Sequence, residues 1–257
     1  MSRAGFIALA AGVVGALAVA IVAAWFFLLR DVAEPTSVSE AVTTFREEEE
    51  TAPPGPSQVP EGVYVYETDG YEKTDALTGV THRYPRRSTI TVTKDVCGVK
   101  MRWDVLRGRS TTWTYCVDPS GWDVVSQDER HTFFGRTERT TYICGGLPFR
   151  PAGDPPGTVY GVDCSTPSAR ELGTGRVVGR ETLRVSGKPI ETVHLRKTTS
   201  FTGEIRGATT HNVWLARKSG VPVRIVMVSM TTNDSAVGDV RYEERVTLRL
   251  LSLTPRR

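Results

Sequence analysis

Four cysteines are the residues of this chain whose chemistry is easiest to predict from type and spacing: Cys97, Cys116, Cys144 and Cys164. An even number of cysteines in an exported domain indicates disulfides, because such domains mature in an oxidising compartment. A zinc site is the alternative. No two of these cysteines have the close Cys-x-x-Cys spacing that structural zinc sites use, so we expect disulfides and no bound metal.

Three pairings of four cysteines are possible, and the surrounding pattern favours one of them. Residues 99–117 form a predicted hairpin whose turn near residue 108 brings its two ends together. Cys97 and Cys116 lie at those ends. Cys144 and Cys164 flank an irregular segment rich in Gly and Pro, which a second bridge would close. We therefore predict two disulfides between neighbours in the sequence.

A search for catalytic motifs finds none. The chain has no Gly-x-Ser-x-Gly elbow, no phosphate-binding Gly-Lys-Ser/Thr loop and no His-Glu-x-x-His pair. Its four histidines are dispersed, and none has a partner at ligand spacing: His82, His131, His194 and His211. We expect no catalytic residues and no cofactor, and we rank an enzyme acting on wall or lipid below a binding protein.

One carboxylate is expected in an unusual place. Tyr242, Val246, Leu248 and Leu250 alternate with polar residues, which is the pattern of a strand with one buried face. The same alternation turns Glu244 inward, where a carboxylate needs a partner or a cavity. A β-bulge that shifts the register is the alternative interpretation.

Two neighbouring strands near the C-terminus carry more apolar residues than a one-sided sheet requires. Residues 204–216 and 221–232 have apolar side chains on both faces. We therefore predict an apolar cleft between a curved sheet and the loop of residues 145–175, with Arg side chains at its rim. The candidate ligand-contacting residues are Trp214, Val223, Ile225, Met227 and Glu244.

The elements that must position these residues are strands. Apolar residues recur with period two through most of the chain after residue 60, and Gly, Pro, Asn or Asp stands at the expected reversals. We predict an all-β domain of roughly nine to eleven antiparallel strands. Such a long meander must curl or close to bury its apolar face, so we expect a large curved sheet, or half-open barrel. The candidate strands are 62–68, 88–94, 99–105, 112–117, 122–134, 137–143, 176–186, 190–201, 204–216, 221–232 and 238–251.

The N-terminal segment has the composition of a chain that lies in a membrane, unlike the strands that follow it. Residues 4–29 contain no charged side chain, and about 20 apolar residues suffice to span a bilayer. We expect residues 1–30 to be an uncleaved single-pass anchor in the cell membrane, with the N-terminus cytoplasmic and the C-terminal domain extracytoplasmic. A cleaved signal peptide is the alternative, with cleavage within residues 1–24. A stripe of small residues spaced by four along this segment also permits self-association of the anchor.

Composition divides the rest of the chain into two parts. Residues 31–60 hold five prolines and four consecutive glutamates, with a net charge of −6, which predicts a disordered acidic stalk. Residues 61–257 form one extracytoplasmic β domain. Because the whole chain carries +3 and residues 1–30 carry +2, this domain carries about +7. Anionic head groups or acidic wall polymers suit such a surface, and we expect no nucleic-acid partner.

The segment from His211 to Arg224 resembles a strand–turn–strand of bacterial lipoprotein-carrier (LolA/LppX-like) proteins. In that family a Trp-containing strand reaches a Gly-Leu/Val-Pro turn and returns through an alternating strand. Here Trp214 precedes the turn Gly220-Val221-Pro222. The whole chain also resembles actinobacterial membrane-anchored envelope proteins of unknown function. The carrier resemblance implies a half-closed sheet with an apolar cavity for acyl chains. This chain lacks the lipobox cysteine and the lid helices of that family.

These observations together predict a non-enzymatic envelope protein that binds a hydrophobic or anionic ligand such as lipid. A structural module that binds another envelope protein is the alternative. A deep apolar pocket would favour the first function, and a flat exposed apolar patch would favour the second.

Overall fold

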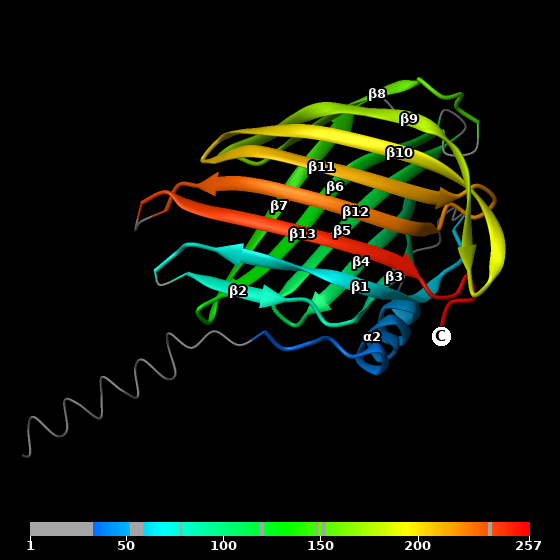
Figure 1. Cartoon of the computed structure of the whole chain (residues 1–257), viewed down its shortest axis with the longest axis horizontal. Coiled ribbons are helices and arrows are strands. Elements are labelled where there is room, and N and C mark those ends of the chain that lie inside the picture. The colour runs from blue at the N-terminus through cyan, green and yellow to red at the C-terminus, as the bar shows by residue number, and fades with distance from the viewer. Residues whose placement is uncertain are drawn as a thin grey trace, which may run out of the picture.

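A computed structural model gives the fold of the chain (Figure 1). The structure describes residues 33–51, 59–77, 79–118, 121–146, 149–150, 153–235 and 238–257. Thirteen described strands form one antiparallel sheet, and one described helix packs beside it. The all-β fold class predicted from the period-two pattern is therefore confirmed.

The strands are long and follow one another as a meander. Their bounds are β1 Gly62–Thr74, β2 Val80–Arg83, β3 Arg87–Asp95, β4 Gly98–Leu106, β5 Arg109–Asp118, β6 Gly121–Phe133, β7 Arg136–Gly146, β8 Val159–Ser165, β9 Ala169–Val185, β10 Lys188–Gly203, β11 Ile205–Ala216, β12 Pro222–Asn233 and β13 Val240–Leu250.

The sheet closes on itself, which corrects the expected half-open barrel. The last strand, β13, pairs with β1 over nine residues, from Tyr66↔Leu250 to Thr74↔Tyr242. Twelve strands thus form a ring, and β2 pairs beside β3 along the same edge of β1. Closure removes the two free edges that an open meander of this length would present to other chains.

The barrel is flattened into two crossing layers. In Figure 1, β9 to β13 and β1 run across the front of the molecule, while β4 to β7 cross behind them at a steep angle. Side chains from both layers meet inside the barrel, because residues along each strand alternate between its inner and outer faces. The inner faces supply the main buried cluster, which includes Trp103, Val193 and Leu248.

Two strands were missed, which explains why thirteen are present instead of nine to eleven. The first, β2, has only four residues, and the second, β8, lies inside the Gly/Pro-rich segment 145–175. The Thr166-Pro167 pair could also begin a short helical turn over residues 166–172, but in the structure β9 begins at Ala169. The Thr166 hydroxyl instead accepts hydrogen bonds from the backbone N–H groups of Ser168 and Ala169, which makes a tight turn between β8 and β9.

The helix α2, Val38–Thr51, forms where the sequence predicted a disordered stalk. The Ser37 hydroxyl caps its N-terminus by accepting a hydrogen bond from the Glu40 N–H. Ala41 and Phe45, spaced by four residues, are buried against Val63 of β1. This small apolar contact orders the segment despite its acidic run, so the expected disorder is corrected for residues 38–51.

The predicted single-pass localisation is also corrected. In the part of the chain that the structure describes, no helix is both long and apolar enough to cross a bilayer. The described helix α2 has 14 residues and ends in an acidic run. Residues 4–29, on which the predicted anchor and its self-association rested, lie outside the described residues.

Candidate ligand-binding site

The interior of the barrel holds two adjoining cavities of different chemistry. One, of about 130 Å³, is lined mainly by apolar side chains, and the other, of about 650 Å³, is lined by many polar and charged side chains together with apolar ones. Four residues line both of them: Gln127, Lys197, His211 and Met227. We call the first the apolar cavity and the second the polar chamber.

Aromatic side chains make up much of the apolar cavity. Trp122 packs on Phe149 with ring centroids 6.2 Å apart, and Phe149 stacks on Tyr160 at 5.1 Å. The opposite wall is aliphatic and includes Ile225 and Leu248. The cavity lies inside the closed barrel and not between a curved sheet and a loop, because β8 and β9 of the segment 145–175 are strands of the barrel wall. Lys197 is the cationic side chain among its described lining residues, so the Arg rim expected for the cleft is not found there.

The polar chamber lies toward the other end of the barrel. Residues from several hairpin turns line its outer part, among them Leu77 after β1, Phe134 between β6 and β7, and Asp234 after β12. The turns after β1 and β12 lie at the left end of the molecule in Figure 1. This end of the barrel is therefore where a ligand would enter the chamber.

An ion pair crosses the inner end of the chamber. Arg109 on β5 donates through Nε to Glu244 Oε1 at 3.2 Å and through Nη2 to Glu244 Oε2 at 2.8 Å. The Tyr84 hydroxyl donates a further short hydrogen bond to the same carboxylate. Both charged side chains are 2% exposed, so each depends on the other for solvation. The inward Glu244 predicted from the sequence is confirmed, together with its partner.

A second buried carboxylate lies beside this pair. Glu72 on β1 contacts His82 at 3.0 Å and His131 at 3.3 Å, and it accepts a hydrogen bond from the Tyr242 hydroxyl at 3.2 Å. Burial alone would raise the pKa of Glu72. The two histidines and the charge of Arg109 instead lower this pKa to about 2, so Glu72 is ionised.

His131 lies between two carboxylates, since its other ring nitrogen is 3.6 Å from Glu129. Burial and the charge of Arg109 lower the pKa of His131, but the hydrogen bonds to Glu129 and Glu72 outweigh them and raise it. For Glu129, burial raises the pKa, while His131, Arg109 and Gln127 lower it to about 2. The geometry therefore favours an imidazolium between two carboxylates.

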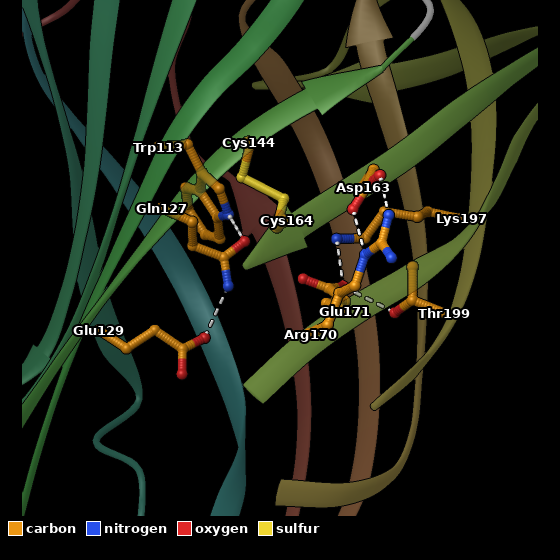
Figure 2. Close-up of a disulfide and its surroundings, with 10 residues drawn as sticks. All are labelled: Trp113, Gln127, Glu129, Cys144, Asp163, Cys164, Arg170, Glu171, Lys197 and Thr199. Atoms are coloured by element: carbon orange, nitrogen blue, oxygen red, sulfur yellow. Dashed lines mark hydrogen bonds and ion pairs between the residues drawn. A yellow bond between two sulfur atoms is a disulfide. The ribbon is translucent and has the colours of Figure 1, made fainter. Parts of the chain in front are cut away.

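A third acidic group lies on the opposite wall, on β9 (Figure 2). Glu171 is 1% exposed, and its Oε1 accepts hydrogen bonds from Lys197 Nζ at 3.0 Å and from the Thr199 hydroxyl at 2.7 Å. Its Oε2 is buried without a hydrogen-bond partner. In Figure 2 one oxygen of Glu171 points away from Lys197 and Thr199, toward the side of the interior where Gln127 and Glu129 lie.

Carboxylates outnumber permanent cations around the chamber. Three inward carboxylates line the chamber, Glu129, Glu171 and Glu244, and Glu72 lies beside them, 3.8 Å from Arg109. Arg109 and Lys197 are the inward cations of fixed charge among the lining residues described above. His211 adds no charge at neutral pH, because burial and the nearby Lys197 hold its pKa well below the usual range. The interior is thus acidic, although the domain as a whole is basic.

The structure brings together three of the five candidate ligand-contacting residues. Ile225 lines the apolar cavity, Glu244 lines the polar chamber, and Met227 lines both. Val223 is buried in the core on the same inward face of β12. Trp214 lies apart from them, on the outer face of β11, where it stacks on His194 with centroids 4.1 Å apart and lies beneath Arg224.

Both predicted disulfides are confirmed. Cys97–Cys116 links the ends of the β4–β5 hairpin. Cys144–Cys164 links β7 to β8, and both of its residues line the apolar cavity. The second bridge strengthens the shortest pairing in the ring, because β7 and β8 share only four residue pairs, from Ile143↔Ser165 to Gly146↔Val162.

Most of the polar chamber was missed by sequence reasoning. Arg109 was assigned to a turn, and Glu171 lies in a segment interpreted as loop or helix. A signal was nevertheless present in β6, where Gln127, Glu129 and His131 recur with period two on one face. By itself, however, the polar run 128–131 facing the polar run 136–139 is explained equally well by cross-strand ion pairing. The described residues include no group of three or more His, Cys, Asp or Glu side chains arranged to hold a metal ion.

Comparison with known proteins gives little information. No protein-family model matches the sequence, and no curated protein matches it significantly. Among solved structures, the hypothetical lipoprotein YmcC from Escherichia coli (K12) is similar, with 12% sequence identity, 82% of this chain and 96% of that chain covered, and a TM-score of 0.29. A likeness at this score defines neither the detailed fold nor the function of this chain.

Proposed function

We propose that this protein is a binding protein that holds a small amphipathic molecule inside its barrel. The observation that carries the proposal is the pair of adjoining cavities, one apolar and one polar, joined at shared lining residues such as Met227. The apolar part of the ligand would lie among Trp122, Phe149 and Ile225. Its polar part would lie in the larger chamber, among the charged side chains.

The size and chemistry of the interior support this proposal. Ligand pockets commonly have volumes of about 300–1,000 Å³, and the polar chamber alone has about 650 Å³. The apolar cavity is small at about 130 Å³, so a short alkyl or aromatic group suits it better than a long acyl chain. Buried charges in both walls would fix the orientation of the polar part, because few ligands can satisfy them in more than one way.

Native mass spectrometry of the purified protein tests the proposal, since a bound molecule adds a defined mass. Ser229 on β12 lines the chamber beside Thr209, so a Ser229→Trp variant would fill part of it. Ser200→Trp places the same side chain on an exposed outer position and is the matched control. We expect an added mass in the wild type and in S200W, and its loss in folded S229W.

Retention of the same mass in folded S229W would place the ligand elsewhere and contradict the proposal. Circular dichroism establishes whether each variant is folded. Should the wild type carry no added mass after purification, the same comparison is made after incubation with octan-1-ol and n-octylammonium, two short amphipathic probes. Failure of the folded wild type to take up either probe would also contradict the proposal.

A further inference from the structure

The free carboxylate oxygen of Glu171 is the most informative polar atom in the chamber. The side chain is 1% exposed and makes two hydrogen bonds, both through Oε1. Its Oε2 is buried and has no partner in the protein. Buried carboxylate oxygens are normally satisfied, so an unpaired one on a side chain that lines a large cavity indicates a missing hydrogen-bond donor. A ligand or ordered water must supply that donor.

The surroundings of Glu171 show what kind of donor fits. Tyr142 of β7 lines the same chamber and is 2% exposed, and its ring lies edge-on to Phe201 with centroids 6.3 Å apart. Burial raises the pKa of Tyr142, and the charges of Glu129 and Glu171 raise it further. Glu129 and Glu171 both line the chamber, so a second negative charge belongs to the space that the free oxygen adjoins.

The positively charged side chains nearby already form ion pairs with carboxylates of the protein. Lys197 forms an ion pair with Glu171 through Oε1. Arg109 is held by Glu244, and His131 lies between Glu129 and Glu72. A second carboxylate entering this space would meet the charges of Glu129 and Glu171, while each of these three cations is already paired with a carboxylate of the protein. Like charges at close range are unfavourable. An ammonium group would donate to Oε2 and be attracted by Glu129 and Glu171.

We propose that Glu171 Oε2 accepts a hydrogen bond from a protonated amine of the ligand, with Glu129 as the second anionic neighbour and Tyr142 and Phe201 as an aromatic wall. This inference rests on the proposed function, because it assumes that the chamber takes a ligand. It also reverses the sequence-based expectation of an anionic ligand. The acidic interior would then bind the amine, and the basic outer surface of the domain would have a separate role.

Calorimetric titration with three probes of equal chain length tests the inference. The probes are n-octylammonium, octan-1-ol and octanoate at pH 7.5, each below its aggregation concentration. Charge-assisted hydrogen bonds are stronger than neutral ones, so we expect octylammonium to bind about tenfold or more tightly than octanol. We expect octanoate to bind more weakly than either. Equal affinities, or an order led by octanoate, would overturn the inference.

Glu171→Gln keeps the shape of the side chain and removes its charge. Glu191→Gln on β10 makes the same change at a side chain that is 69% exposed and serves as the control. We expect E171Q to weaken octylammonium binding by about tenfold or more. Octanol binding should stay within about threefold in both variants, which also shows that the chamber remains intact. An unchanged preference for octylammonium in E171Q would show that the free oxygen holds water only.

The outcomes separate this inference from the proposed function. If none of the three probes binds the folded wild type, the proposed function fails. If all three bind but do not distinguish E171Q from the wild type, the chamber binds ligands and only the amine subsite is rejected. If E171Q does not fold, the order of the three probe affinities in the wild type tests the amine subsite. The variant Glu129→Gln provides a second test, because it should weaken the binding of octylammonium and leave the binding of octanol unchanged.

Discussion

Arg109 and Glu244 form a two-point ion pair across the inside of the barrel, although 135 residues separate them in the sequence. Arg109 begins β5 and Glu244 lies on β13, so the pair links the two layers of the flattened barrel. Both side chains are almost fully buried. Each charge is therefore solvated mainly by its partner, and the pair constrains how the layers cross.

The first prediction concerns this pair. Arg109→Met leaves Glu244 buried without its cation, which typically costs about 3–5 kcal/mol of unfolding free energy. The double variant R109M/E244L removes both charges and should recover much of that loss. Arg206→Met breaks an exposed pair with Asp234 and Asp239 and should cost no more than about 1 kcal/mol. Urea denaturation measures the unfolding free energy of all three variants. Similar small losses of unfolding free energy in R109M and R206M would contradict this prediction.

The second prediction concerns acid stability. The pKa of Glu72 is lowered to about 2 in the folded state from an ordinary value of 4.5. A lowered carboxyl pKa contributes stability that is present above the unfolded value and is lost as the pH falls toward the folded value. At 1.36 kcal/mol per unit, the contribution is on the order of 3 kcal/mol. The unfolding free energy should fall between pH 4.5 and 2, and less so in Glu72→Gln. If the unfolding free energy falls equally with pH in the wild type and in Glu72→Gln, Glu72 has no such role.

The third prediction concerns His131 at the opposite end of the pH range. Because the folded pKa of His131 is raised, its contribution is fully present below the unfolded value of about 6.5. It is lost as the pH rises through the folded pKa, so stability should decline above neutral pH. His131→Gln should remove this alkaline decline. NMR titration of the imidazole measures the pKa directly, and a value below 6.5 would refute the prediction.

The fourth prediction concerns the two disulfides, which close loops of similar length, with separations of 19 and 20 residues. In the chain-entropy model each bridge should contribute about 3 kcal/mol. Their local effects should differ, because β7 and β8 share few residue pairs. Replacing Cys144 and Cys164 by Ser should increase hydrogen exchange in β7 and β8 beyond the loss of global stability. Replacing Cys97 and Cys116 by Ser should leave the paired residues of β7 and β8 protected from hydrogen exchange. Equal exchange in β7 and β8 in both variants would contradict the prediction.

Period-two alternation predicted most of this fold, because an antiparallel meander follows directly from strand pattern and turn residues. Eleven strands were located, and Glu244 was placed inward by the same alternation. Closure was not predictable, since the pairing of β1 with β13 joins segments about 180 residues apart. The short β2 and the Gly-rich β8 carry too weak a pattern to identify. Helix α2 depends on the contact of Phe45 with Val63, which no local composition reveals.

The candidate site was harder to predict for a related reason. Inward polar residues such as Glu171 and His131 look like surface residues in the sequence, because polar positions in strands usually face solvent. A closed barrel with a large interior cavity gives such side chains a second direction in which to point. Ile225, Met227 and Glu244 were identified because their strands are strongly patterned. Trp214 was included because its strand carries apolar residues on both faces, yet it packs on the outer face against His194.

We propose that one amphipathic ligand lies across both cavities, with its polar end near Glu171 and its apolar end among Phe149, Ile225 and Leu248. A crystal structure with 8-bromooctylammonium would locate both ends of such a ligand, because bromine gives an anomalous signal at the end of the chain. We predict a single strong bromine peak inside the apolar cavity and the ammonium nitrogen within hydrogen-bond distance of Glu171 Oε2. Bromine peaks confined to the outer surface, with water alone filling the barrel, would contradict the account.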